Sequence, residues 1–296
     1  MRKNHLKNVL EYYPFRALIA VLKLLPYRLS KAFILGLFHW VGYGLGIRRK
    51  VASIQLRKVY PDWPQERINE VMKGLYRQMG LNIIEEYLMS DAELERISEI
   101  QGREYVDEAL AMGRGAILAT AHFGNWEAAR ILPLKGIPLS VITKKQRNTL
   151  FDDYTNAIRE RSGLHVIDMK RGLRDIISDL KDNRMVAILA DQNAGSHGLV
   201  LDFLSYPASH WKGVAKLSLR YQIPIVPGFV VRTKDDGLRF EFSPMIYHPD
   251  LEDKEENYEK VLSQIIAITE RYIHKYPDHW FWVHKRWKHA YDMFQR

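Results

Sequence analysis

The stretch GAILATAHFGNWE, from Gly115 to Glu127, decides how the rest of the chain can be interpreted. Its small and branched apolar residues stop at His122, a pattern that predicts a buried strand with an imidazole at its tip. A tight turn into a helix is expected next, with Asn125 as the N-cap and Glu127 in the first turn, where the helix dipole favours a carboxylate. The segment therefore predicts a strand-to-helix corner that carries both a histidine and a glutamate.

Strands and helices are expected to alternate on both sides of this corner. Further strands are predicted at 138–143, 164–168, 185–190, 225–232 and 280–283, and helices at 62–90, 104–112, 126–132, 148–162, 173–181, 210–221 and 257–275. Residues 238–243 should pair with 225–232 in antiparallel fashion, and 91–100 should be a solvated acidic segment. The alternation predicts one α/β domain with a mixed, mainly parallel sheet flanked by helices.

The N-terminal residues are the most apolar part of the chain. One stretch, 9–26, is interrupted by charges and ends at Pro26, and the next, 32–47, has no charged residue. A spanning helix needs roughly 20 apolar residues, so we expect helices that lie in the membrane interface, with buried core helices or a single span as alternatives. The predicted organisation is a membrane-associated helical segment at 1–50 and a main domain at 51–296.

The composition narrows the chemistry. There is no cysteine, which excludes thiol nucleophiles and thiolate metal sites. The sequence also lacks a G-x-S-x-G elbow, a phosphate-loop lysine motif, H-E-x-x-H, and a G-x-G-x-x-G after a strand. Lys and Arg number 44 against 35 Asp and Glu, which favours anionic partners such as a membrane surface, acidic carrier proteins or phosphorylated substrates. No nucleic-acid-binding motif supports nucleic acid as a partner.

His122 and Glu127 suggest acid–base chemistry. A carboxylate that accepts a hydrogen bond from one imidazole nitrogen leaves the other nitrogen free to take a proton from a hydroxyl. Without a cysteine or serine nucleophile, the substrate's own hydroxyl is the simplest attacking group, which suits direct acyl transfer. A histidine that only caps the turn, beside a solvated Glu127, is the alternative, and no adjacent ligands suggest a metal site. Lys144 and Asp191 follow other predicted strands and are expected at the same edge of the sheet.

The segment HFGNWE, residues 122–127, resembles the H-x4-D/E motif of the glycerolipid and lysophospholipid acyltransferases. Its form is similar to that of one branch, the bacterial late acyltransferases of lipid A biosynthesis. Later segments that resemble this branch are Arg159–Gly163, Ala190–Asn193, Tyr206–Ala208 and Pro277–Lys288, so that the likeness covers roughly residues 1–290. The resemblance identifies a family and leaves the substrate open.

This resemblance implies a glycerolipid acyltransferase-like fold and a reaction. An acyl chain would pass from an acyl carrier protein or coenzyme A thioester to a hydroxyl of a membrane glycolipid, with a lipid A precursor as the leading acceptor. The enzyme would act at the cytoplasmic face of the bacterial inner membrane, as a monotopic or single-span protein, without a metal or further cofactor. The alternatives are another glycolipid or lysophospholipid as acceptor, a non-catalytic lipid-binding or membrane-tethering protein, and a thioesterase or lipid hydrolase.

The resemblance also implies roles for individual residues. His122 would be the general base and Glu127 its orienting partner. Arg159, or the nearby Arg161, would bind the anionic substrate or the oxyanion, and Asp191 would support the site electrostatically. A solvated helix end for the arginines and a turn position for Asp191 stay open. The expected substrate-binding set is completed by Asn125, Lys144, Gln192 and Arg286.

Overall fold

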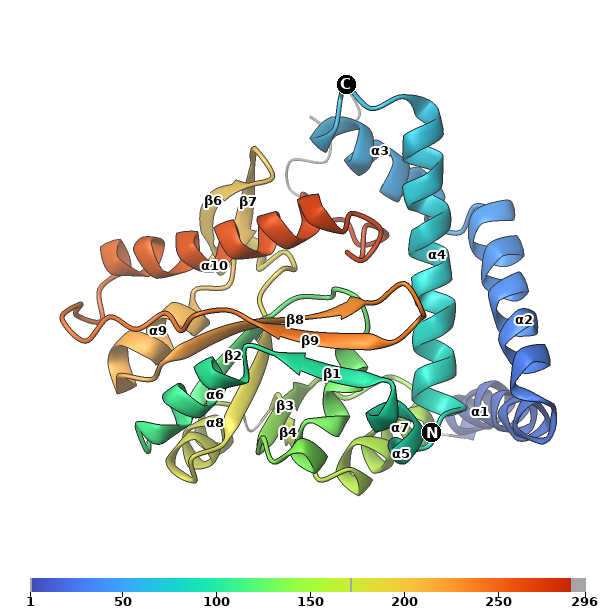
Figure 1. Cartoon of the computed structure of the whole chain (residues 1–296), viewed down its shortest axis with the longest axis horizontal. Helices are drawn as coiled ribbons and strands as arrows, with labels where there is room; N and C mark the ends of the chain where they lie inside the picture. Colours follow the sequence, from blue (N-terminus) through green and yellow to red (C-terminus); the bar gives the residue numbers. More distant parts are fainter. Residues whose placement is uncertain (1, 171, 289–296) are drawn as a thin grey trace.

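A seven-stranded sheet organises the protein (Figure 1), whose computed structural model describes residues 2–170 and 172–288. The strands are β1 (Ser98–Gln101), β2 (Ala116–Thr120), β3 (Leu139–Thr143), β4 (His165–Asp168), β5 (Met185–Leu189), β6 (Leu199–Phe203), β7 (Tyr206–His210), β8 (Ile225–Arg232) and β9 (Leu238–Phe242). The sheet order is β1-β9-β8-β2-β5-β3-β4, and β6 and β7 form a separate hairpin. The pairs β8–β2, β2–β5, β5–β3 and β3–β4 are parallel, whereas β8 and β9 are antiparallel. The predicted mixed, mainly parallel sheet is confirmed.

Helices surround the sheet, and the N-terminal helices lie to one side of it (Figure 1). They are α1 (Arg2–Leu24), α2 (Tyr27–Leu37), α3 (Arg49–Val59), α4 (Gln65–Tyr87), α5 (Asp91–Arg96), α6 (Arg103–Ala111), α7 (Thr149–Arg161), α8 (Gly172–Lys181), α9 (Gly213–Tyr221) and α10 (Glu255–Lys275). Residues Phe38–Gly44 form a π-helix, η1, and the short 3₁₀ helices are η2 (Trp126–Ile131), η3 (Pro133–Lys135) and η4 (Gly195–His197).

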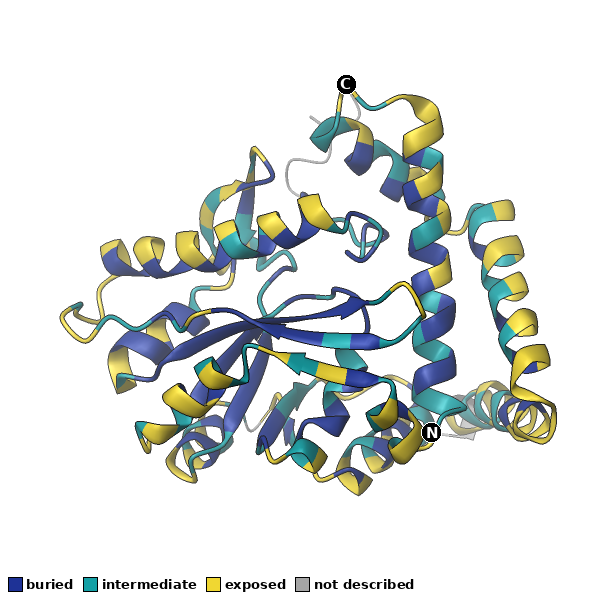
Figure 2. Ribbon diagram, viewed as in Figure 1, coloured by how far each residue is buried: buried dark blue, intermediate teal, exposed yellow. Residues whose placement is uncertain are grey.

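The strands of the central sheet are largely buried (Figure 2). Their two faces contribute to two separate hydrophobic clusters. Along β2, Ile117 and Ala119 belong to the cluster that contains α9 and α10, whereas Ala116 and Leu118 belong to the cluster that contains α6 and η2. This alternation follows from the two-residue period of a strand. Burial on both faces explains why β2 is a continuous apolar run. The run ends before His122, where the chain leaves the sheet.

The N-terminal helices pack along one side of the main domain, with α2 and η1 against α4, and α1 against α7 (Figure 1). Leu22, Ile34, Leu81 and Ile84 form a small buried cluster between these helices. Many of the large apolar residues there are nevertheless exposed: Leu6, Leu10, Tyr13, Leu18, Val21, Leu24, Leu25, Tyr27, Leu29, Phe33, Leu37, Trp40, Leu45 and Ile47. Within the described part of the chain, no helix has both the length and the apolar character needed to cross a bilayer.

The structure corrects several boundaries. Residues 91–100 are not simply solvated, because Ser90 and Glu93 cap α5 with a capping box and β1 pairs with β9 to form the sheet edge. The helix expected at 210–221 starts at Gly213, because Tyr206–His210 pairs with β6. The segment predicted as helix 126–132 is the 3₁₀ helix η2.

The strand predicted at 280–283 is wrong. Within the described residues, its only strand-like contact is an isolated bridge between Phe123 and Trp280. The Gln55 amide satisfies the backbone instead, since its Nε2 donates to the carbonyls of Trp282 and His284 at 2.6 and 2.9 Å. A buried side chain thus replaces the ladder that a strand would need. Residues 289–296, at the end of the predicted 51–296 domain, lie outside the described residues.

Candidate active site

The register of the sheet brings His122 and Asp191 together. In the parallel pair β2–β5, Thr120 lies opposite Leu189. His122 and Asp191 each follow two residues later, so both side chains emerge at the carboxyl edge of the sheet. His122 Nδ1 lies 2.9 Å from Asp191 Oδ1. His122 and Asp191 are 69 residues apart in the sequence, and the pairing of β2 with β5 brings them together.

Both nitrogens of the His122 ring are engaged, and their partners define the tautomer. Nδ1 donates to Asp191, whereas Nε2 accepts a hydrogen bond from the Gln192 side-chain amide at 3.1 Å. Nε2 therefore carries the lone pair that a general base requires. The His122 side chain is 22% exposed against 3% for Asp191, so the base reaches solvent while its partner is buried.

Asp191 is held as a carboxylate. Its second oxygen accepts a hydrogen bond from Trp280 Nε1 at 2.9 Å. Burial alone would raise the pKa of the Asp191 carboxyl, but the charge of His122 and the hydrogen bonds from His122 and Trp280 hold that pKa below its usual range. A buried carboxylate that stays ionised can stabilise the imidazolium that forms when His122 takes a proton.

The turn that carries His122 is fixed on three sides. Gly124 has φ of +57°, and a Cβ there would lie 1.9 Å from the carbonyl oxygen of Val230, so only glycine fits. Asn82 on α4 donates to the Gly124 carbonyl at 2.7 Å. The C-terminal segment closes the third side, with Phe281 N donating to the carbonyl of His122 at 3.1 Å. The imidazole thus projects from a backbone with little freedom to move.

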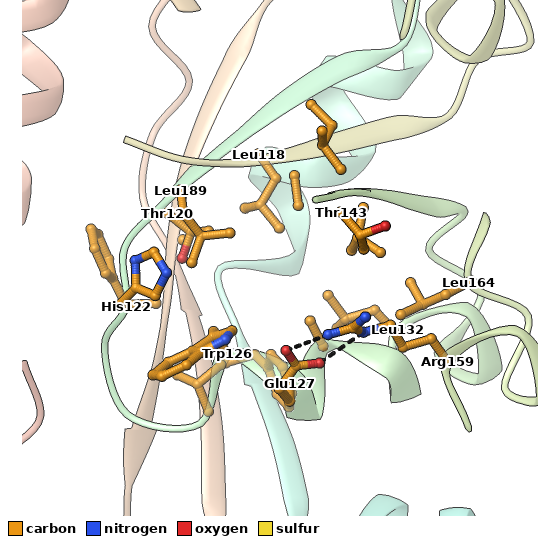
Figure 3. Close-up of a pocket in the computed structure, with 18 of the residues that line it drawn as sticks. Leu118, Thr120, His122, Trp126, Glu127, Leu132, Thr143, Arg159, Leu164 and Leu189 are labelled. Atoms are coloured by element: carbon orange, nitrogen blue, oxygen red, sulfur yellow. Dashed lines mark hydrogen bonds and ion pairs between the residues drawn. The ribbon is translucent and has the colours of Figure 1, made fainter. Parts of the chain in front are cut away.

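Glu127 does not orient His122 in this structure, contrary to the sequence prediction. Its carboxylate forms a two-point ion pair with Arg159 on α7, at 2.6 Å to Nη2 and 3.0 Å to Nε. Figure 3 shows the Glu127 carboxylate facing the Arg159 guanidinium. Because the 3₁₀ helix η2 starts at Trp126, Glu127 is directed toward α7, and the orienting contact comes from Asp191 instead.

A second carboxyl group lies beside this ion pair. Burial and the neighbouring charge of Glu127 raise the pKa of Glu86, near the end of α4, to about 7. Burial opposes the charge of Arg159, but Glu127 and Glu86 together raise the pKa of that guanidinium. One arginine is therefore shared by two acids: it forms a two-point ion pair with Glu127 and interacts with Glu86 through charge.

The other predicted site residues divide into two groups. Asn125 caps η2 as predicted, but it is 1% exposed and its amide donates to Glu85 at 2.6 Å, so it supports the turn and does not face a substrate. Arg161 is exposed and pairs with Asp91 at 3.2 Å, which leaves Arg159 as the arginine at the site. Lys144 and Gln192, in contrast, line the cavities described below.

Arg286 also departs from the prediction. It is fully buried and donates to the Ser209 carbonyl at 2.8 Å and to the His210 ring. Burial lowers the pKa of its guanidinium to about 10. Arg286 therefore ties the C-terminal segment to the β6–β7 hairpin, and it is not on a surface where it would meet a lipid phosphate.

Two cavities meet at His122. The smaller, about 220 Å³, extends between the sheet and η2, is largely apolar and contains the Glu127–Arg159 pair at one end (Figure 3). Its apolar lining includes Leu118, Leu132, Val141, Leu164, Phe240 and Phe242. The larger cavity, about 890 Å³, lies on the Gln192 side of the imidazole, between α8 and α9. Lys144 lines both cavities. One base is thus accessible to two separate ligands.

Some residues of the site are not identified from the sequence. Lys216 and Arg220 on α9 line the larger cavity, and Trp280 fixes Asp191. Lys216 and Arg220 could have been identified from their spacing of four residues, which places them on one helix face. Trp280 falls in the segment that the sequence predicts as a strand, where its indole has no assigned partner. Within residues 2–170 and 172–288, no group of three or more His, Asp or Glu is placed to hold a metal ion.

Comparisons with known proteins identify the family of the chain. The sequence model described as bacterial lipid A biosynthesis acyltransferase matches residues 2–289. A lipid A biosynthesis acyltransferase of Haemophilus influenzae is 24% identical over 272 residues, covering 90% of this chain and 83% of the relative. A phosphatidylinositol mannoside acyltransferase of Mycobacterium tuberculosis is 30% identical over 141 residues, covering 46% of this chain and 44% of the relative. The solved structure of the 1-acyl-sn-glycerophosphate acyltransferase PlsC from Thermotoga maritima is 12% identical, with a TM-score of 0.38, and covers 83% of this chain and 98% of that one.

Proposed function

We propose a specific reaction for this chain, which belongs to the bacterial lipid A biosynthesis acyltransferase family. It transfers a fatty acyl chain from a thioester of acyl carrier protein or coenzyme A to a hydroxyl of a membrane glycolipid, a lipid A precursor. The observation that carries the proposal is the His122–Asp191 pair at the junction of an apolar cavity and a larger, open one. The smaller cavity takes the acyl chain, and the acceptor approaches through the larger one.

His122 acts as the general base. Its Nε2 takes the proton of the acceptor hydroxyl as the hydroxyl oxygen attacks the thioester carbonyl carbon. The tetrahedral intermediate expels the thiolate, which receives the proton from the imidazolium, so the products are an ester and a free thiol. The Gln192 amide holds the position at Nε2 that the hydroxyl must take, and it moves aside when the acceptor binds.

Arg159 is the side chain that we assign to the oxyanion. A guanidinium has five N–H groups, and Arg159 uses its Nε, Nη1 and Nη2 for single bonds to Glu127 and Asn156. Two N–H groups thus remain to meet the negative charge that develops on the carbonyl oxygen. In this proposal Glu127 is a positioning residue for Arg159, and Asp191 has the corresponding role for His122.

The N-terminal helices attach the enzyme to the membrane that contains its lipid acceptor. We propose that residues 1–50 form a monotopic attachment to the cytoplasmic face of the inner membrane. The exposed apolar side chains of α1, α2 and η1, such as Leu24, Leu29 and Trp40, would enter the interface. The surplus of basic residues suits an anionic membrane surface and an acidic carrier protein.

Mass spectrometry of membrane lipids tests the reaction. Cells that express the wild type should contain a glycolipid that is heavier by one acyl group, and cells that express a folded His122→Ala variant should lack it. Acyl carrier protein and coenzyme A thioesters, offered separately to the purified protein, identify the donor. Equal lipid profiles from both proteins would favour a tethering role, and fatty acid release without an acceptor would indicate a hydrolase.

A second acceptor is favoured by one comparison. The similarity to a phosphatidylinositol mannoside acyltransferase supports a mannosylated lipid as an alternative substrate. Parallel assays with a lipid A precursor and with phosphatidylinositol mannoside decide between the two acceptors, since only the true acceptor should be acylated at a rate that depends on His122.

A further inference from the structure

We infer that the larger cavity contains a phosphate-binding site formed by Lys144, Lys216 and Arg220. The inference rests on the proposed acyl transfer and names the chemistry that one substrate must carry: a phosphate ester within reach of His122. Two sources share this chemistry, namely a phosphorylated sugar of the acceptor lipid and the phosphopantetheine arm of the donor.

The three cations come from two elements that meet at the cavity. Lys216 and Arg220 lie one turn apart on α9 and therefore on the same helix face. Lys144 follows directly after β3, at the carboxyl edge of the sheet where His122 also emerges. All three residues line the cavity that reaches the imidazole.

The charges of this cavity are not balanced. The described residues that line it include no aspartate or glutamate. No ion pair involves Lys144, Lys216 or Arg220 within the described chain, although the Arg220 guanidinium lies 5.8 Å from the centre of the Tyr221 ring. The smaller cavity differs, because there the charge of Arg159 is matched by Glu127. An anionic ligand is therefore attracted to the larger cavity.

The remaining lining suits an amphipathic ligand. Leu173, Ile176 and Leu217 are apolar, and the aromatic rings of Trp211 and Tyr221 are exposed at its edge. Lysine and arginine together bind phosphate oxygens by charge-assisted hydrogen bonds, and aromatic faces pack well against sugar rings and apolar chains. The cavity thus combines a cationic side with a hydrophobic wall, as a phosphorylated lipid or a phosphopantetheine thioester would require.

Substrates with and without phosphate distinguish the two sources. The acceptor arm compares a phosphorylated lipid A precursor with the same lipid after phosphatase treatment. The donor arm compares an acyl carrier protein thioester with an acyl N-acetylcysteamine thioester, which has no phosphate. Each is assayed with the wild type, with Lys216→Gln/Arg220→Gln, and with Lys212→Gln as the matched control, since Lys212 pairs with Glu255 and does not line the cavity.

We expect the double variant to raise KM for the phosphorylated member of one arm by at least about tenfold, because it removes two cationic donors of charge-assisted hydrogen bonds to the phosphate. The double variant should keep KM for the member without phosphate within about twofold of wild type. The Lys212→Gln variant should keep KM for both members within the same range. A Lys216→Arg variant should retain most of the affinity for the phosphorylated substrate. This result would show that the positive charge at residue 216 matters more than the shape of its side chain.

Equilibrium binding keeps this test independent of turnover. Isothermal titration calorimetry with the two acceptor lipids, and with 4′-phosphopantetheine against pantetheine, should give the same order of affinities without any reaction. The site is refuted if the double variant binds the phosphorylated ligands as the wild type does, or if it loses affinity equally for ligands with and without phosphate. Absence of acyl transfer alongside phosphate-dependent binding would refute only the proposed function.

Discussion

The substitution Asp191→Asn tests whether a buried carboxylate makes His122 a base. Asparagine keeps the size of the side chain, but only one of its two terminal groups can accept a hydrogen bond. Asp191 now accepts from two donors, His122 Nδ1 and Trp280 Nε1. An asparagine that accepts from Trp280 presents its NH2 group to Nδ1, so the imidazole must carry its proton on Nε2 and can no longer take one there.

The expected loss follows from this change of tautomer. General base catalysis contributes about 10²–10⁴-fold, and loss of an orienting carboxylate costs about 10⁴-fold in the serine protease triad. Asp191→Asn should therefore lower kcat by roughly 10²–10⁴-fold, or about 3–5 kcal/mol of transition-state stabilisation. KM for both substrates should change little, because Asp191 is buried beneath the imidazole.

A matched variant separates catalysis from folding. Asp179 is also buried and pairs with the Nδ1 atom of His165 at 2.6 Å, but neither residue lines either cavity. Steady-state acyl transfer and thermal unfolding should be measured for Asp191→Asn, Asp179→Asn and Glu127→Gln. If Asp191→Asn retains activity within a few-fold of wild type while Glu127→Gln is as inactive as His122→Ala, the orienting role belongs to Glu127 and our reasoning is wrong.

Three further substitutions test the turn, the buried acid and the acyl cavity. Gly124→Ala should cost at least about 2 kcal/mol of unfolding free energy, seen as a lower melting temperature, because its φ is positive and a Cβ would overlap the Val230 carbonyl. Glu86 holds its proton up to about pH 7 when folded and loses it near pH 4.5 when unfolded, so it lowers stability as pH rises between these values, by at most about 1.4 kcal/mol per pH unit. Glu86→Gln should remove this pH-dependent loss of stability. Urea unfolding of the wild type and the variant between pH 4.5 and 7 measures the difference in their unfolding free energies, and a difference that does not change with pH would contradict the raised pKa of Glu86. Gly228→Val should displace the Phe242 ring into the smaller cavity, because a Cβ at residue 228 would lie 2.7 Å from that ring, and should shift the preference toward shorter thioesters by about fourfold per methylene lost; an unchanged preference in a competition assay would place the chain elsewhere.

The central sheet could be predicted because its strands are buried on both faces. The strand expected at 225–232 has the observed bounds, and the strand expected to end before His122 is observed as Ala116–Thr120. Continuous apolar runs of this kind have few alternatives in an α/β pattern. The hairpin Leu199–His210 and the short edge strand β1 lack such runs, and their pairing depends on contacts distant in sequence.

The C-terminal segment shows a different reason for failure. Its alternating aromatic and polar residues fit the two-residue period of a strand, yet Trp280, Trp282 and Trp287 are all buried. The Gln55 amide donates to the Trp282 carbonyl, and the indole nitrogens of Trp280 and Trp282 donate to Asp191 and to the Pro277 carbonyl. Neither partner can be inferred from the local pattern, since the period of a strand says nothing about a distant amide side chain.

The pairing within the site has the same origin. Proximity in sequence suggests that Glu127 orients His122, because only four residues separate them. In a parallel sheet, however, residues at equal distances beyond paired strand ends are brought together whatever their separation in sequence, and Thr120 opposite Leu189 places His122 beside Asp191. Glu127 lies beyond a turn that changes direction at Gly124, and it meets Arg159. The x4 spacing therefore places two polar residues at one corner, but their partners are set by the sheet register for one and by α7 for the other.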